Sequence, residues 1–313
     1  MMSVATTLYA QNTVVKQSLC YAEREHQQLS LDHYTLFDSE AKADDSAESL
    51  RPCLIFVFGG GFAGGERDNE AYIPFFEAMV RGGVDVVSID YRLGLRMLAG
   101  IDGDVRMMVG ALRNAVDIAV QDLYTATNYV VEHSEAWNIN PRQIILCGSS
   151  AGAITALQAE WGRCIGSEAA QVLPEEFRYG GVIACAGAIF STSGRPKWAG
   201  EPAPIMLFHG TSDSNVPYNC ASMFGVGFYG SEYIAGQLDK LGSPYYFYSV
   251  AYADHSIAIT PLVEQSDLIL QFIDEYVVRG AQRRTIAEVV VLNGTKGKTR
   301  FSVMDYLQSN YAR

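Results

Sequence analysis

The sequence predicts an α/β protein with a mostly parallel central sheet and helices on both faces. Continuous apolar runs rich in β-branched residues alternate with longer segments of helical periodicity, which is typical of βαβ units. The runs contain few polar residues, as expected of strands covered on both faces. One run, residues 144–147, leads directly into Gly-x-Ser-x-Gly around Ser150, and a small-residue segment follows at 151–159. That order predicts a strand, a sharp turn and a helix.

The remaining elements follow from the same patterns. Residues 28–37 alternate loosely in polarity and predict an early edge strand. Buried strands are expected at residues 54–58, 84–91, 182–186, 205–208 and 245–252, and helices at 73–81, 115–133 and 262–278. Loops are expected at residues 39–51, at 93–103, and across about twenty residues between the strands that begin at 182 and 205. In the loop at 93–103, Met97 and Leu98 are candidate pocket residues.

Length and composition restrict the class of protein. The 313 residues suffice for one large domain or two small ones, and 49% hydrophobic with 19% charged residues is a globular composition. A net charge of −12 without a basic stripe argues against a nucleic-acid partner. No run approaches the roughly 18 apolar residues of a membrane span.

The main domain is expected over residues 12–280, with different material at each end. Residues 1–11 are mildly apolar and end in Ala10-Gln11, like the remnant of a signal peptide without its positive start. Export to the periplasm or the exterior is therefore one expectation, and a cytoplasmic location is the alternative. Residues 281–313 form a C-terminal extension, in which 286–292 and 300–303 are expected to pair as a hairpin around Asn293-Gly294.

The cysteines indicate neither a metal nor a cofactor. Cys53, Cys147 and Cys185 lie in or beside strand-like runs, where cysteine behaves as a small buried hydrophobe. A single disulfide among Cys20, Cys164 and Cys220 remains open. No CxxC or Cys/His spacing predicts a metal site, and no cofactor is expected.

Ser150 is the candidate nucleophile. A serine hydroxyl becomes reactive when it is exposed, lies beside a base and faces backbone donors that hold a developing oxyanion. A strand-to-helix turn meets the first requirement, and it leaves no room for a Cβ atom at Gly148 or Gly152.

The strand ends offer a base and an acid. Of the five histidines, His255 is the expected base because it lies just beyond the last core strand. The other four are expected at edges, on the surface or in structural roles: His26, His33, His133 and His209.

Asp213 is the expected acid, since it completes the chain order Ser, Asp, His. Asp254 is the alternative, disfavoured because adjacent loop residues generally point apart. The other interpretation of Asp213 is a turn-forming residue that caps its own loop.

Backbone amides of Gly60, Gly61 and Ala151 are the expected oxyanion donors. The glycines follow Phe58 at the end of a predicted strand and allow the backbone to approach a bound carbonyl oxygen. A phosphate-binding loop would require Gly-Lys-Ser/Thr or Gly-x-Gly-x-x-Gly, and neither pattern occurs here.

Six motifs in this order resemble the α/β-hydrolase superfamily, in its esterase/lipase branch of carboxylesterase and hormone-sensitive-lipase types. They are Phe58-Gly59-Gly60-Gly61-Phe62, Asp90-Tyr91-Arg92-Leu93, Asn140-Pro141, Gly148-Ser149-Ser150-Ala151-Gly152, His209-Gly210-Thr211-Ser212-Asp213 through Val216-Pro217, and Asp254-His255. The resemblance implies an α/β-hydrolase fold with a small or absent cap. It also implies a Ser150–Asp213–His255 triad and an oxyanion hole of Gly60, Gly61 and Ala151, which together cleave a carboxylic ester through an acyl-enzyme intermediate.

The sequence departs from that family at two points. Phe58 stands where the family has the histidine that opens the glycine loop, and the usual helical cap before this loop is missing. Residues 219–241 are the candidate for a small lid, and so thin a cap predicts a small-molecule or glycan-linked ester substrate. The alternatives are a prolyl-oligopeptidase-type peptidase, which would need a large N-terminal domain, and a non-catalytic binding protein, which would have lost a triad residue.

Overall fold

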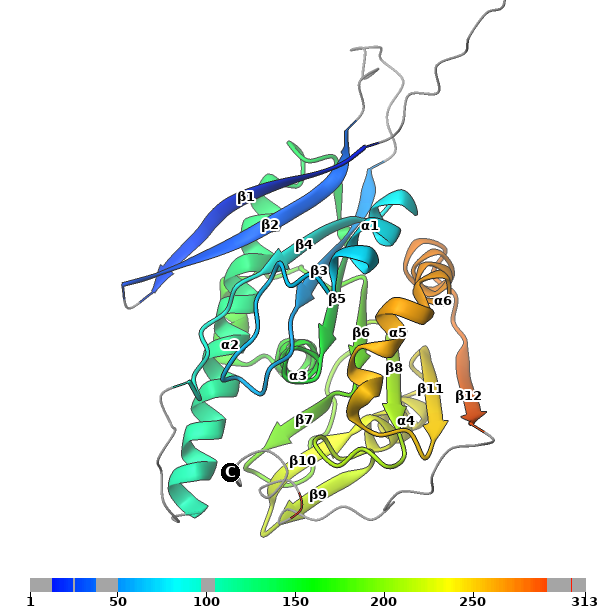
Figure 1. The fold of residues 1–313 in the computed structure, drawn as a ribbon. Coiled ribbons are helices and arrows are strands. Elements are labelled where there is room, and N and C mark those ends of the chain that lie inside the picture. The colour runs from blue at the N-terminus through cyan, green and yellow to red at the C-terminus, as the bar shows by residue number, and fades with distance from the viewer. Residues whose placement is uncertain (1–12, 25, 38–49, 97–104, 292–304, 306–313) are drawn as a thin grey trace, which may run out of the picture.

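The computed structural model describes residues 13–24, 26–37, 50–96, 105–291 and 305 (Figure 1). Its main feature is a nine-stranded sheet in the order β1-β2-β4-β3-β5-β6-β8-β11-β12. The strands from β4 to β12 are parallel, whereas β1 and β2 pair antiparallel with each other and β2 pairs antiparallel with β4. The strands are β1 Thr13–Arg24, β2 Gln27–Phe37, β3 Arg51–Val57, β4 Asp85–Ile89, β5 Ile139–Ser149, β6 Gly181–Cys185, β8 Ile205–Gly210, β11 Tyr245–Ala251 and β12 Arg284–Val290.

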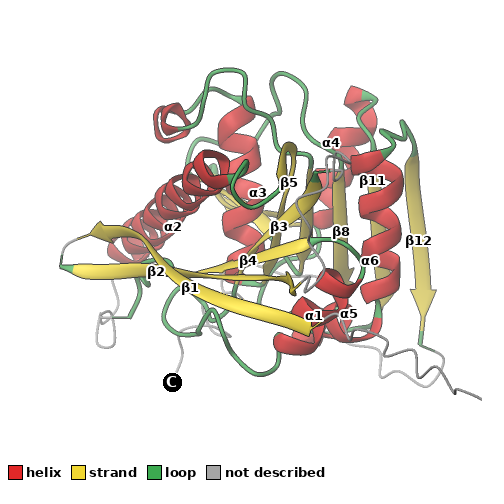
Figure 2. Cartoon of the chain, turned by 90° about the horizontal axis from the view of Figure 1, so that it is seen from above, coloured by secondary structure: helices red, strands yellow, loops and turns green. Residues whose placement is uncertain are grey.

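Helices cover both faces of this sheet, as predicted (Figure 2). α1 (Ile73–Arg81) and α6 (Ser266–Phe272) contact each other on one face, and α2 (Val105–His133) packs with α3 (Ala151–Cys164) on the other. The helix α4 (Ser231–Leu241) contacts β8 and β11. Local sequence sets several ends: α1 begins with a proline in its first turn, and α4 ends at Gly242 in the left-handed conformation.

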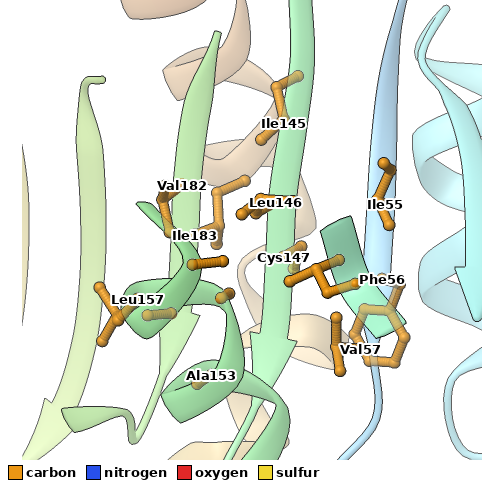
Figure 3. Packing of buried hydrophobic residues seen from close by; sticks show 14 of the residues in the cluster. Ile55, Phe56, Val57, Ile145, Leu146, Cys147, Ala153, Leu157, Val182 and Ile183 are labelled. Atoms are coloured by element: carbon orange, nitrogen blue, oxygen red, sulfur yellow. The ribbon is translucent and has the colours of Figure 1, made fainter. Parts of the chain in front are cut away.

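The apolar runs of the central strands form the core behind the candidate nucleophile. β3, β5 and β6 carry fully buried side chains, and α3 packs against these three strands (Figure 3). The buried strand residues include Phe56, which contacts the rings of α1, and Ile145, Leu146 and Ile183; Leu157 of α3 is buried with them. Because these strands are covered on both faces, their sequences lack the polar alternation of a half-exposed strand.

The edges of the sheet differ from the prediction. β1 was not predicted, because within it only Tyr21 is buried and its sequence has mixed polarity. Since β1 pairs with β2, the strand expected at the edge is the second strand of the sheet. At the other side β12 pairs in parallel with β11, so residues 284–290 belong to the main sheet and not to a separate extension.

The C-terminal helix is broken into three parts. α5 (Thr260–Glu264) and α6 are separated by Gln265, whose φ of −123° interrupts the helix. A π-helical segment, η3 (Ile273–Val278), then follows α6. The prediction of one continuous helix over residues 262–278 was therefore wrong, because apolar periodicity does not register a local break of this kind.

A second, three-stranded sheet occupies two stretches expected to be loop or lid. Its order is β7 (Ala188–Ser191), β10 (Val226–Gly230) and β9 (Cys220–Met223). The predicted lid thus divides into a hairpin, β9–β10, and the helix α4. Ile234 and Leu238 of α4 are fully buried, so this helix covers the main sheet and is no lid.

Several predictions fall on residues that the structure leaves undescribed. These are the signal-like segment 1–11, the pocket candidates Met97 and Leu98, and the hairpin partner 300–303. All six cysteines are described and all are free. The disulfide considered among Cys20, Cys164 and Cys220 is therefore not formed. Across the part of the chain that is described, no helix is both long and apolar enough to cross a membrane.

Candidate active site

Ser150 lies at the tip of the predicted strand-turn-helix. β5 ends at Ser149, α3 begins at Ala151, and Ser150 between them adopts φ 52° and ψ −116°. A Cβ atom on Gly148 would lie 2.3 Å from the Gly152 carbonyl carbon, and one on Gly152 would lie 1.9 Å from the Val57 oxygen. Only glycine fits at both positions, as the sequence indicated. A non-glycine residue at such a φ stores roughly 1–3 kcal/mol of backbone strain, a feature often found at active sites.

His255 lies next to this serine. Its Nε2 atom is 2.8 Å from Ser150 Oγ, and the residue opens the short 3₁₀ helix η2 (His255–Ala258) just after β11. Asp254, the alternative acid, has a different partner: its carboxylate accepts a hydrogen bond from the backbone N–H of Ser256 at 2.9 Å. Adjacent residues therefore serve different partners, as argued from the sequence.

Asp213 holds the other side of the imidazole. Its Oδ2 atom lies 2.8 Å from His255 Nδ1, while Oδ1 accepts the backbone N–H groups of Asn215 and Val216 at 2.8 and 2.9 Å. One oxygen of this aspartate therefore caps its own loop, and the other faces the histidine. Burial opposes ionisation of Asp213, but hydrogen bonds from His209 and His255 hold its pKa well below the usual range.

These contacts decide which ring nitrogen of His255 carries the proton. An ionised carboxylate only accepts hydrogen bonds, so Nδ1 of His255 must donate to Asp213. In the neutral ring this leaves the lone pair of Nε2 directed at the Ser150 hydroxyl, which can donate to it. Ser150, His255 and Asp213 thus form a row in which one proton can move from the serine to the histidine.

The glycine loop after β3 packs against the serine turn. A Cβ atom on Gly59 would lie 3.3 Å from Ser150 Cβ, so the peptide that carries the Gly60 amide lies beside the serine. Gly60 and Gly61 have φ values of 127° and 63°, open only to glycine at low cost. The Ala151 N–H belongs to the first turn of α3, where backbone donors have no partner within the helix and the helix dipole favours negative charge.

Two tyrosines support this loop where the resembled family uses a histidine. The Tyr91 hydroxyl donates to the Phe58 carbonyl at 2.9 Å, and the Gly59 N–H approaches the Tyr72 hydroxyl at 3.4 Å. The Phe58 ring is buried against Tyr91, with ring centroids 4.5 Å apart. Sequence reasoning missed both tyrosines, although Tyr91 is the last residue of the strand predicted at 84–91 and lies in the Asp90-Tyr91-Arg92 motif.

Sequence reasoning also missed the place of His209, which it assigned a purely structural role. This buried residue of β8 has its Nε2 atom 3.4 Å from Asp213 Oδ2. The available signal was the four-residue spacing of His209 and Asp213 directly after a strand. Among the residues that the structure describes, no group of three or more His, Cys, Asp or Glu side chains is placed to hold a metal ion.

Part of the sequence matches known proteins. Residues 41–162 match the family model BD-FAE. Esterase B1 of Culex pipiens is 28% identical over 102 residues, and the juvenile hormone esterase of Heliothis virescens is 30% identical over 107. The matched segments cover 33% and 34% of this chain but only 17% of each insect protein.

Solved structures resemble this chain over most of its length. A thermophilic esterase from Thermogutta terrifontis, Est2, superimposes with a TM-score of 0.57 at 20% identity, over 82% of this chain and 92% of that one. MGS-M1, an α/β-hydrolase enzyme from a deep-sea metagenome library, gives a TM-score of 0.55 at 17% identity, over 85% and 98%. These likenesses confirm the fold predicted from the sequence.

Proposed function

We propose that this chain, an α/β-hydrolase-fold protein of the esterase/lipase type, is a serine hydrolase that cleaves a carboxylic ester through an acyl-enzyme intermediate. The observation that carries the proposal is the hydrogen-bonded row from Ser150 Oγ to His255 and on to Asp213, with 2.8 Å at each step. This row supplies a nucleophile, a base and an acid that orients the base, the three parts that acyl transfer requires.

The proposed reaction has two halves. His255 Nε2 takes the Ser150 proton as Oγ attacks the ester carbonyl, and Asp213 stabilises the imidazolium that forms. The amides of Gly60, Gly61 and Ala151 hold the oxyanion of the tetrahedral intermediate. His255 then gives its proton to the departing alcohol. Water, deprotonated by the same histidine, releases the carboxylic acid and restores Ser150.

The relatives favour a small acyl group. The Thermogutta terrifontis esterase has been solved with propionate bound and with butyrate bound. The same protein has been solved phosphorylated by paraoxon, phosphonylated by cyclosarin and phosphoramylated by tabun. We therefore propose a short-chain carboxylic ester as substrate, and expect organophosphorus reagents to modify Ser150.

The test is hydrolysis of p-nitrophenyl esters of rising chain length by wild type, Ser150→Ala and Ser149→Ala. We expect acetate and butyrate esters to be cleaved best, and Ser150→Ala to reduce kcat by more than about a thousandfold. Ser149→Ala is the matched control, because this neighbouring serine is buried, with 1% of its surface exposed, and the hydrogen bond to His255 is made by Ser150.

A fluorophosphonate probe gives an independent readout, since only an activated serine reacts with it. Wild type and Ser149→Ala should be labelled and Ser150→Ala should not. Ester hydrolysis that survives Ser150→Ala at the wild-type rate, or a wild type that neither hydrolyses the series nor takes the label, would refute the proposal.

A further inference from the structure

A second histidine contacts the proposed acid. His209, in β8, is completely buried, and both of its ring nitrogens have polar partners. Nδ1 lies 2.7 Å from Ser231 Oγ at the start of α4. Nε2 lies 3.2 Å from the Val216 carbonyl oxygen and 3.4 Å from Asp213 Oδ2. The edge of the Tyr218 ring also faces this imidazole, at a centroid distance of 5.6 Å.

These partners determine where His209 carries a hydrogen. The Val216 carbonyl and the ionised Asp213 carboxylate are acceptors only, so Nε2 must be protonated in either charge state of the ring. In the neutral ring Nδ1 then accepts from the Ser231 hydroxyl. The Nε2–H group therefore points between the carbonyl and the carboxylate. Its separation from Asp213 is long for a hydrogen bond but short enough for strong attraction in a buried site.

The geometry gives this N–H group a specific task. Oδ1 of Asp213 is fixed by two backbone amides, and Oδ2 is the oxygen that accepts from His255 Nδ1. With Oδ1 alone anchored, the carboxylate can still turn about its side-chain bond. A second donor on Oδ2, besides His255, restricts that rotation and keeps this oxygen facing His255 Nδ1.

We propose that His209 is a positioning residue, which holds Asp213 Oδ2 in place for His255. This inference rests on the proposed function for its catalytic meaning, but its geometric content can be measured without turnover. The competing explanation is that His209 merely fills the core and ties the Val216 carbonyl.

His33 provides a matched control for that explanation. It is also a buried histidine bonded to a buried aspartate, with Nε2 2.8 Å from Asp85 Oδ2. The pair joins β2 to β4, away from Ser150. Replacing His33 should therefore cost stability as a core histidine does, without reaching His255.

The experiment is an NMR titration of the His255 ring protons in wild type, His209→Phe, His209→Gln and His33→Phe. We expect His209→Phe to lower the pKa of His255, because a carboxylate free to turn away stabilises the imidazolium less. Glutamine presents an N–H near the position of Nε2, so His209→Gln should restore most of the wild-type pKa. His33→Phe should leave it unchanged. If His209→Phe fails to fold, Ser231→Ala replaces it, because it removes the partner of His209 Nδ1. A smaller downward change in the pKa of His255 is then expected.

Activity gives the second readout. For p-nitrophenyl acetate we expect His209→Phe to lower kcat by about tenfold with KM nearly unchanged, equivalent to about 1.4 kcal/mol, and His209→Gln to recover it. An unchanged or raised pKa of His255 in His209→Phe, or equal effects from His33→Phe, would overturn the positioning role. A wild-type protein that neither cleaves esters nor reacts with fluorophosphonate would refute the proposed function instead. The NMR titration would still show whether His209 positions Asp213 for His255.

Discussion

At the scale of single residues, the site depends on positions where only one residue type fits. Ser150 holds a positive φ, and the glycines two residues before and after it let β3, β5 and α3 approach one another. The strain at Ser150 is local, whereas the contacts that maintain it are made by the surrounding core. A change at either glycine should therefore affect folding as well as activity.

We predict that Gly152→Ala destabilises the protein by more than about 3 kcal/mol, because the new methyl group would lie 1.9 Å from the backbone oxygen of Val57. Gly236→Ala is the matched control. That glycine is exposed in the middle of α4 with open space around it, so alanine should stabilise by roughly 0.5–1 kcal/mol. Urea unfolding measures both, and a Gly152→Ala protein of wild-type stability would contradict the packing described here.

Asp213 makes stability depend on pH in a definite direction. Its pKa in the folded protein lies below the ordinary value of 3.8, so its ionisation stabilises the fold. That stabilisation is complete above the unfolded pKa and is lost as pH falls through the folded one. We predict that the difference in unfolding free energy between wild type and Asp213→Asn narrows as the pH falls below about pH 4.

Denaturant unfolding at several pH values tests this dependence. Asp267→Asn is the control for loss of an exposed carboxylate, because Asp267 is exposed in α6. A difference between wild type and Asp213→Asn that widens below about pH 4 would show that burial of the carboxylate outweighs its hydrogen bonds.

At the scale of elements, the glycine loop depends on side chains that precede and follow it. Tyr91, just after β4, and Tyr72, just before α1, bind the backbone at Phe58 and Gly59. The loop amides proposed as oxyanion donors are thus supported by hydroxyl groups from both sides. A histidine at position 58 is not needed for this, because the Phe58 ring fills the space against Tyr91.

We predict that Tyr91→Phe costs about 1–3 kcal/mol of stability, since it leaves the buried Phe58 carbonyl without its donor. It should also lower kcat by about tenfold through a looser oxyanion loop, a smaller loss than removal of a donor itself. Tyr34→Phe is the matched control, because the buried Tyr34 hydroxyl has no hydrogen-bond partner among the described residues. Equal effects of the two substitutions on kcat would argue against a supporting role for Tyr91.

At the scale of the whole molecule, the sheet ends in two strands of mixed polarity. β1 and β12 have mostly exposed or half-exposed residues, and each covers an inner neighbour with more buried positions. Such edge strands separate the apolar interior of the sheet from other chains. The high net negative charge of −12 also favours solubility.

We predict that deletion of residues 284–313 lowers the midpoint of thermal unfolding and promotes aggregation, because the edge of β11 would lose its hydrogen-bonded partner. Ile286→Lys is the control. Its side chain is 58% exposed, and the substitution leaves backbone pairing intact. Thermal unfolding and size-exclusion chromatography report both effects, and a truncated protein as stable and soluble as the full chain would show that β12 is dispensable.

Much of the fold could be predicted because its signals are local. Apolar runs located the central strands, and periodicity and caps located α1 to the residue. The glycines beside Ser150 followed from the stereochemistry of a single turn. The chain order of Ser150, Asp213 and His255, each just past a strand, selected the three residues that the structure brings within hydrogen-bond distance. Their catalytic roles stay a prediction.

The sequence by itself therefore determined the features that neighbouring residues impose on one another. These are the buried strands, the helices between them and the turn that presents Ser150. Only the tertiary structure decided that β1 and β12 join the sheet and that β7 pairs with β10. It also decided that Tyr91 supports Phe58 and that His209 meets Asp213. The physical reason is that these elements are short or of mixed polarity, and these side chains are common core residues. Their roles arise from partners brought together by folding, which no local pattern of residues records.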